Sequence, residues 1–266
     1  HYCNYQRSKP NSCTACGSNT LDTKGFGTEQ IELELKELYP DYKIGRMDLD
    51  TTRGKNGYQK IIGAFEAREI DILVGTQMLS KGLDFDNVSL VGILNADTML
   101  NFPDFRAHER SYDMMVQVSG RAGRSRKQGN VAIQTFNPYH QILQQVSTTD
   151  YAEMYKEQLQ ERWQYHYPPY YRLIKITLKH KDYTKVDNGI NWLAKALQNV
   201  FAENVLGPTA PVVSRVRNQY IKNLTIKIPP NQNLAATKQQ LNKIKDTFQS
   251  VKDFRPIRFI VDVDAQ

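Results

Sequence analysis

Two short runs of consecutive apolar residues, IDILVG at residues 70–75 and VSLVGIL at residues 88–94, limit the possible fold more than any other feature. Apolar residues that follow one another without alternation are typical of a strand buried on both faces in a parallel sheet. Parallel strands are joined by crossover connections, most often helices. We therefore expect a parallel α/β domain, in which ligands bind at the carboxyl ends of the strands.

Helical spacing of apolar residues supports this expectation. Thr28 is the expected N-cap of a first helix, because apolar residues follow it at helical spacing, and Pro40 ends that helix. The other elements expected in this domain are a strand at 44–47, a helix at 58–65, a helix at 105–116 and a strand at 129–136. We expect the apolar side of the helix at 105–116 to pack onto the sheet.

A change in composition near residue 150 indicates a second domain. The elements expected there are a polar connecting helix at 150–166, a break at 167–171, strand 172–179, helix 185–201, strand 212–216, strand 219–228, helix 234–248 and strand 257–263. From residue 172 the order is βαββαβ, which is that of the ferredoxin-like α+β fold. The predicted domain boundaries are 1–22 for a cysteine segment, 23–149 for the α/β domain, 150–170 for the connection and 171–266 for the α+β domain.

Composition excludes some classes of protein and leaves others open. With 266 residues, 40% of them hydrophobic, the chain can bury one large core or two ordinary ones. It has no apolar run near the roughly 20 residues that span a membrane, and no secretory leader is visible. The net charge of +7 and the pI of about 9.1 permit nucleic-acid binding without proving it. Because the first residue is His1, we expect a fragment or a processed product.

The three cysteines, Cys3, Cys13 and Cys16, lie within the first sixteen residues. An odd number that includes a C-x-x-C pair does not fit a disulfide framework, whereas two thiolates at this spacing can bind one tetrahedral zinc ion. A closed zinc site needs four ligands, so these cysteines would be part of a broken zinc ribbon whose other ligands lie upstream of His1. The alternative is three free thiols in a frayed tail.

Polar residues follow the first apolar run, in GTQMLSKGLDF at residues 75–85. Thr76 comes directly after the buried strand, where it can hydrogen-bond a phosphate oxygen, and Lys81 adds positive charge for a nucleic acid or a nucleotide. Gly82 and Asp84 are candidates for contact with a ribose hydroxyl. Asp84 could equally be a turn carboxylate that caps backbone amides.

The segment QVSGRAGR at residues 117–124 places Arg121 and Arg124 three residues apart, each directly after a glycine. Arginine keeps its charge and offers a planar fork of donors, so the pair suits arginine fingers that stabilise charge on a transferred phosphoryl group. Gln117 precedes the pair at fixed spacing. Asp97, which follows the second apolar run, could couple to the arginines or cap a helix. The alternative for the arginines is a solvated basic turn.

A basic segment, RVRNQYIKNLTIKI at residues 215–228, belongs to the second domain. Arg215, Arg217 and Lys222 could lie along a nucleic-acid backbone while the ring of Tyr220 stacks on a base. The alternative is a half-buried hairpin with a solvated polar face.

In combination and in this order, GTQMLSKGLDF, NAD and QVSGRAGR resemble the second RecA-like lobe of a superfamily 2 helicase, with the first as motif V and the last as motif VI. More narrowly, the chain is similar to the PriA family of bacterial primosomal helicases. The similarity extends over nearly the whole chain and includes the segments GFGTEQIELELKELYP, RMDLDTTRGK, DFRAHER, YPPYYRLIKI, LGPTAP and FIVDVDAQ. It implies a C-terminal fragment made of the end of a zinc module, the second helicase lobe and a C-terminal domain.

The resemblance implies roles for the residues near the nucleotide. Arg121 and Arg124 would face the triphosphate that the first lobe holds, and Gln117 would lie near the same phosphates. Gly82 and Asp84 would approach the nucleotide from this lobe.

The resemblance also implies DNA and zinc contacts. Thr76 would hold a phosphate of single-stranded DNA, and the C-terminal domain would contribute to binding branched DNA and partner proteins. Cys13 and Cys16 would belong to one of two zinc sites and Cys3 to the other. The remaining ligands would lie upstream, so we expect weak or no zinc binding by this chain.

The function implied is that of an ATP-dependent 3′–5′ DNA helicase of the bacterial cytoplasm. Such a protein uses ATP with Mg²⁺, recognises stalled or branched replication forks, and restarts replication by primosome assembly. Its partners would be single-stranded and forked DNA, primosome proteins and single-stranded-DNA-binding protein. Two alternatives remain, a non-enzymatic module for DNA binding and primosome assembly, and a double-stranded-DNA translocase that does not separate strands.

Half of the expected catalytic machinery is missing from the sequence. The chain contains no G-x-x-x-x-G-K-[ST] phosphate loop and no Asp-Glu pair to bind magnesium in the manner of a helicase. We therefore expect this chain alone not to hydrolyse ATP, and to supply the half of the site that acts on a nucleotide held elsewhere.

Overall fold

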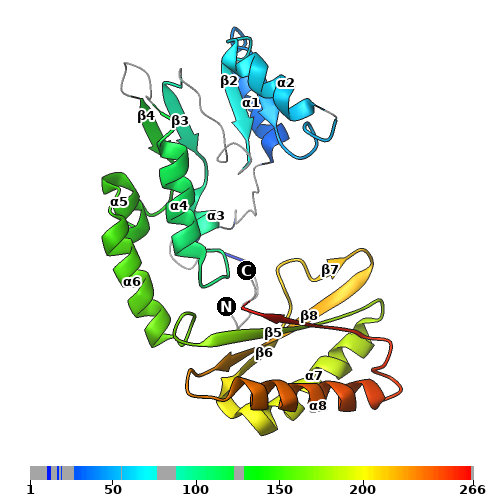
Figure 1. Cartoon of the computed structure of the whole chain (residues 1–266). Coiled ribbons are helices and arrows are strands. Elements are labelled where there is room, and N and C mark those ends of the chain that lie inside the picture. Colours follow the sequence, from blue (N-terminus) through cyan, green and yellow to red (C-terminus); the bar gives the residue numbers. More distant parts are fainter. Residues whose placement is uncertain are drawn as a thin grey trace. The chain divides into compact units, whose positions relative to one another are not determined.

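The computed structural model describes residues 11–12, 17, 19, 27–54, 56–76, 88–122 and 129–264 (Figure 1). Contacts divide the chain into two compact units. The first, called here the α/β unit, consists of the described residues of Lys9–Phe102 and Arg106–Met154. The second, called the C-terminal unit, consists of those of Tyr155–Gln266 together with Pro103–Phe105.

The first half of the α/β unit consists of two helices and a parallel pair of strands. In chain order these are α1 (Thr28–Leu38), β1 (Ile44–Met47), α2 (Gly57–Glu66) and β2 (Ile72–Gly75). The strands pair in parallel, with Ile44 opposite Ile72. Met47 of β1 and Ile62 of α2 are buried in a small core against which Leu73 of β2 packs. The strand–helix–strand order expected here is therefore confirmed.

The second half of the α/β unit repeats the parallel pairing and adds more helices. Its elements are β3 (Leu90–Ile93), α3 (Ala96–Leu100), α4 (Ala107–Ser119), β4 (Asn130–Ile133) and α5 (Gln141–Thr148). Strands β3 and β4 pair in parallel. The buried side chains of its core are Ala96, Leu100, Tyr112, Met115, Ile142, Leu143, Val146 and Met154. Helix α4 packs mainly on α3 and α5 and less on β3, whereas the sequence predicted packing on the sheet.

The parallel α/β character is confirmed, with two differences from expectation. The strands described in this unit form two separate parallel pairs, β1–β2 and β3–β4, which residues 77–87 connect in the chain. Thr28 is not the N-cap of α1. Gly27 is the N-cap, and the Thr28 hydroxyl donates instead to Oδ2 of Asp48 at 2.7 Å. Thr28 is thus the first helical residue, and its hydroxyl is the donor of a long-range hydrogen bond, whereas an N-cap hydroxyl would accept one from the helix amides.

The C-terminal unit is a four-stranded antiparallel sheet with a short fifth strand and two long helices. The elements from the connecting helix onward are α6 (Tyr151–Gln164), β5 (Arg172–His180), α7 (Tyr183–Phe201), a 3₁₀ turn (Ala202–Asn204), β6 (Val205–Thr209), β7 (Arg215–Val216), β8 (Gln219–Ile228), α8 (Leu234–Ser250) and β9 (Arg258–Val263). The strand order is β6-β8-β5-β9, and β7 pairs with β8. Helices α7 and α8 lie on the same side of the sheet (Figure 1). This arrangement confirms the ferredoxin-like βαββαβ order.

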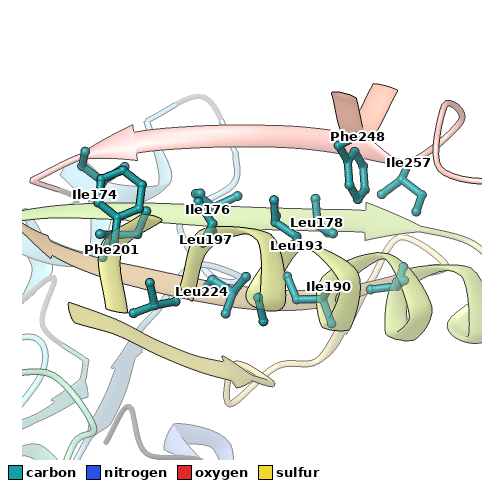
Figure 2. Packing of buried hydrophobic residues seen from close by; sticks show 14 of the residues in the cluster. Ile174, Ile176, Leu178, Ile190, Leu193, Leu197, Phe201, Leu224, Phe248 and Ile257 are labelled. Carbon is teal, nitrogen blue, oxygen red and sulfur yellow. The ribbon is translucent and has the colours of Figure 1, made fainter. Parts of the chain in front are cut away.

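Alternation along the strands and helical spacing in α7 bring the core of this unit together. Figure 2 shows Ile174, Ile176 and Leu178 of β5 facing the apolar side chains of α7. Among the latter, Ile190 and Leu193 are completely buried. The N-cap of α7 is Asp182, whose carboxylate accepts hydrogen bonds from the first-turn amides and so fixes where the helix begins.

The strand predicted at 212–216 is wrong in its position. The second long strand of this unit is β6 (Val205–Thr209), and only Arg215 and Val216 of the predicted range are in a strand. The pair Gly207–Pro208 in β6 is typical of a turn, but β6 lies at an edge of the sheet, where a proline costs no ladder hydrogen bond. The pairing of β6 with β8 shifts between Leu206 and Thr209, which accommodates the proline.

Candidate functional site

The carboxyl ends of β3 and β4 are tied together by Asp97 in the first turn of α3. Its Oδ1 accepts a hydrogen bond from the Thr135 hydroxyl and its Oδ2 accepts one from the Phe136 amide, both at 3.0 Å. Asp97 is not the N-cap of α3, which is Asn95. The contacts described for Asp97 thus give it a structural role at this edge of the unit.

The C-terminal end of α4 presents two of the predicted phosphate contacts. Gln117 is exposed in the last turn, and the half-buried Arg121 follows four residues later, its amide donating to the Val118 carbonyl at 3.0 Å. Gly120 between them has a φ of −64°, so it does not use a conformation reserved for glycine. An added Cβ there would approach the Val116 carbonyl oxygen at an ordinary 3.4 Å.

Thr76 directly follows β2 and is exposed, at the carboxyl end of a parallel strand where a ligand contact was expected. The remaining predicted contacts on this unit and the predicted zinc ligands lie outside the described residues. They are Lys81, Gly82, Asp84, Arg124, Cys3, Cys13 and Cys16. Their roles stay predictions.

The carboxyl end of β1 is organised by Asp48, which is buried directly after the strand. Its Oδ1 accepts hydrogen bonds from the amides of Asp50 and Thr51 at 3.0 and 2.9 Å, while its Oδ2 accepts the bond from Thr28. Arg46 lies 3.4 Å from the same carboxylate. Hydrogen bonds from Thr51 and Thr28, with the charge of Arg46, lower the pKa of Asp48 from 3.8 to about 2.

We expect Asp48 to make the α/β unit sensitive to acid. A pKa that is lower in the folded state adds stability above pH 3.8, and this stability is lost as the pH falls toward 2. Asp48→Asn should cost about 1–2 kcal/mol of unfolding free energy at pH 7 and little near pH 2. Urea unfolding followed by circular dichroism at both pH values measures this. Asp41→Asn, at an exposed position, is the control, and an equal loss at both pH values would contradict the pKa as the cause.

In the C-terminal unit, Arg215 and Arg217 lie on the hairpin formed by β7 and β8. Val216 is opposite Gln219, so Arg217 and Asn218 form a two-residue turn. The Arg215 guanidinium lies 4.9 Å from the centre of the Tyr220 ring and donates to Oδ1 of Asn218. Both arginines are exposed on this hairpin, as a contact with nucleic acid requires.

Lys222 differs from the two arginines, because its ammonium group forms an ion pair with Asp187 of α7. It also lies 5.2 Å from the centre of the Tyr183 ring. Burial alone would lower the pKa of Lys222, but the hydrogen bond and charge of Asp187 raise it above the usual value. This pairing holds the Lys222 ammonium group against α7, whereas Arg215 and Arg217 are exposed, and the DNA contacts predicted for the three residues stay predictions.

Positive charge is concentrated in the C-terminal unit. Residues 204–245, from the end of the 3₁₀ turn into α8, contain seven lysines and arginines and no aspartate or glutamate. The other 28 lysines and arginines are balanced by the 28 acidic residues, so this segment accounts for the whole net charge of +7. An excess of positive charge of this kind attracts polyanions such as nucleic acids.

Two features that the sequence did not single out follow β4. Phe136 and Tyr139 are 95% and 87% exposed on the loop before α5, although the loop is held by the hydrogen bond between the Asp97 carboxylate and the Phe136 amide.

His140 caps α5 by accepting a hydrogen bond from the Ile142 amide at 3.2 Å. Burial, with the nearby His108, lowers the pKa of His140 and so favours the neutral form that can accept this bond. The turn residues in NPYH, residues 137–140, were the sequence signal that could have predicted this loop and helix start.

Within the described ranges, no three or more His, Cys, Asp or Glu side chains gather in a way that could hold a metal ion. None of the helices in the described part of the chain is long and apolar enough to span a membrane.

Two family models match the chain. Residues 13–126 match the helicase conserved C-terminal domain, and residues 163–266 match the primosomal protein N C-terminal domain. The chain is 38% identical over 266 residues to the replication restart protein PriA of Bacillus subtilis, covering 99% of this chain and 33% of that protein.

Other relatives give the same result. The replication restart protein PriA of Synechocystis is 38% identical over 267 residues, covering 100% of this chain and 31% of that protein. That of Haemophilus influenzae is 36% identical over 270 residues, covering 100% of this chain and 36% of that protein. The chain thus spans about a third of the length of the curated relatives it matches.

Proposed function

Because the chain belongs to the PriA family of replication restart proteins, we propose that it provides the second motor lobe and the C-terminal domain of an ATP-dependent 3′–5′ DNA helicase. The helicase would act in the bacterial cytoplasm, recognise stalled or branched replication forks and restart replication by primosome assembly. The observation that most supports this is the end of α4, a helix anchored in the core of the unit, where Gln117 is exposed in the last turn and Arg121 directly follows the C-cap, Gly120.

In the proposed mechanism, ATP with Mg²⁺ is held mainly by a first lobe that carries the phosphate loop. Closure of the two lobes would bring Arg121 and Arg124 onto the triphosphate, where their fixed charges stabilise the transferred phosphoryl group. Gln117 would contact the same phosphates, while Gly82 and Asp84 would contact the nucleotide from this lobe. Hydrolysis would then reopen the lobes.

The same chain would hold DNA at two places. Thr76, exposed after β2, and Lys81 would grip a phosphate of single-stranded DNA, so that opening and closing of the lobes moves the strand. Arg215 and Arg217 would contact forked DNA from the C-terminal unit, which carries the net positive charge. Primosome proteins and single-stranded-DNA-binding protein are the proposed protein partners.

Zinc would bind to Cys3, Cys13 and Cys16 only in company with further ligands. Thiolates with two residues between them, as in Cys13 and Cys16, suit tetrahedral zinc, but a closed structural site needs four ligands. We therefore propose two zinc sites in the whole protein and incomplete ones in this chain.

The experiment that tests the motor assignment is DNA-stimulated ATP hydrolysis, measured side by side on this chain and on a full-length protein that contains it. We expect turnover by the full-length protein and none by the chain alone, because the sequence lacks both the phosphate loop and the Asp-Glu pair. Turnover by the chain alone would contradict the assignment.

The second candidate function is a non-enzymatic module for DNA binding and primosome assembly. The concentration of net charge in the C-terminal unit favours it, because that unit contains none of the motor motifs. It predicts that replacing Arg121 and Arg124 by alanine leaves function intact.

A further inference from the structure

The tip of the β7–β8 hairpin has an unusual backbone. Arg217 and Asn218 have φ angles of 48° and 61°, so both residues of the two-residue turn are in the left-handed region, as in a type I′ turn. Such turns favour asparagine or glycine, and a long side chain such as that of Arg217 is strained there. A strained residue that persists at an exposed tip is a reason to look for a function.

The hairpin also holds its charge in place. The Arg215 guanidinium is fixed between Oδ1 of Asn218 and the ring of Tyr220. One strand of the hairpin is extended by a hydrogen bond from the Ile221 amide to the Ser214 carbonyl at 2.9 Å. Residues 210–220, called here the hairpin arm, therefore present two arginines on a short, well-braced ribbon.

The hairpin arm exposes apolar surface beside this charge. Val212, Val213 and Val216 are 75%, 62% and 45% exposed. An arm that only followed phosphates would need cations and polar side chains, not three exposed valines. Apolar side chains beside arginine are the combination that proteins use in the minor groove of DNA, where arginine responds to groove width and apolar groups contact the walls or base steps.

We propose that the hairpin arm enters the minor groove of duplex DNA next to a branch point, with Arg217 inside the groove and the valines against its walls. The hairpin arm is less suited to recognising bases in the major groove through hydrogen bonds. An asparagine that does so uses its side-chain oxygen, and that oxygen of Asn218 at the tip already accepts a bond from Arg215. The absence of acidic residues throughout 204–245 leaves no negative charge on the arm to repel the phosphates that flank the groove. The inference rests on the proposed DNA binding of the C-terminal unit and specifies its mode.

The test measures binding of the 266-residue chain to a fluorescent fork whose duplex arm is rich in A·T pairs, with and without the minor-groove ligand netropsin. Netropsin should weaken binding of the unchanged chain, and its effect on Arg217→Gly, which keeps the valines, should be smaller. Arg217→Gly should bind about fivefold to tenfold more weakly, with a salt slope smaller by about one. Arg255→Ala, which removes an exposed arginine elsewhere in the unit, is the matched control.

A second variant separates apolar contact from charge. Val212→Ser combined with Val213→Ser should weaken binding, reduce the effect of netropsin and leave the salt slope unchanged, because no phosphate contact is lost. Arg217→Gly should not lower the thermal unfolding temperature, since glycine adopts a positive φ without strain. These variants therefore test binding in a folded chain.

Three outcomes would overturn the inference. If netropsin has no effect on the unchanged chain, the contact is not in the minor groove. If Arg217→Gly and the valine variant bind DNA as Arg255→Ala does, the arm is instead a surface for a protein. If the chain binds no DNA under any condition, the proposed DNA binding fails together with the inference, and that result is distinct from the first two.

Discussion

Arg124→Ala in a full-length protein that contains this sequence is expected to lower DNA-stimulated ATP hydrolysis about a thousandfold. An arginine finger stabilises charge that develops on the phosphoryl group during transfer, so its loss affects the chemical step. Arg121→Ala should have a similar effect, because the two guanidinium groups would act on the same triphosphate. DNA binding, measured without ATP, should change little in either variant.

Arg126→Ala is the matched control for this experiment, because it removes a neighbouring charge from the same basic segment. We expect it to retain most of the hydrolysis rate. If Arg124→Ala is as fast as the unchanged protein, these arginines are scaffold or DNA contacts. The assembly module would then become the better account of the chain.

Leu178→Ala is expected to destabilise the C-terminal unit by about 3–4 kcal/mol. Leu178 lies in β5, between β8 and β9, and has no exposed surface. Its removal would leave a cavity against the apolar side of α7 (Figure 2), because neighbouring strands cannot close the space. The loss is a large part of the stability of an ordinary domain.

Tryptophan fluorescence can follow this loss, because both tryptophans of the chain, Trp163 and Trp192, belong to the C-terminal unit. Trp192 packs against Phe248, with the ring centres 5.8 Å apart, so it reports on the same core. Val213→Ala, at an exposed position, should change the urea midpoint little. An equal shift for both variants would mean that Leu178 is not a core residue.

The fold could be predicted in segments where the apolar residues follow one clear pattern, either helical spacing or a strand pattern. The continuous apolar runs gave β2 and β3, and the βαββαβ order of the C-terminal unit followed from strand and helix patterns that did not compete. The position of β6 could not be predicted, because Gly207 and Pro208 are local turn signals that only an edge position in the sheet makes acceptable. Helix α3 has five residues, too few for helical spacing to show.

The candidate site was predictable in residue type but not in all contacts. Gln117 and Arg121 lie at the end of α4 as the motif suggests, because a motif fixes local spacing. The ion pair between Lys222 and Asp187 joins residues 35 apart in the chain, and charge alone could not distinguish Lys222 from Arg215. The nucleotide contacts proposed for these residues involve the first lobe, whose position the spacing within this sequence cannot give.

Because the net charge is confined to residues 204–245, the part of the protein that first attracts DNA would differ from the part proposed to move along it. A polyanion approaching the protein would be steered first toward the C-terminal unit, and raised ionic strength would slow that encounter by screening. In the proposed helicase, the motor lobe would then step along a strand without having to hold the fork by itself. In a full-length protein, we therefore expect salt to raise the DNA concentration at which ATP hydrolysis reaches half its maximal rate and to leave the maximal rate nearly unchanged.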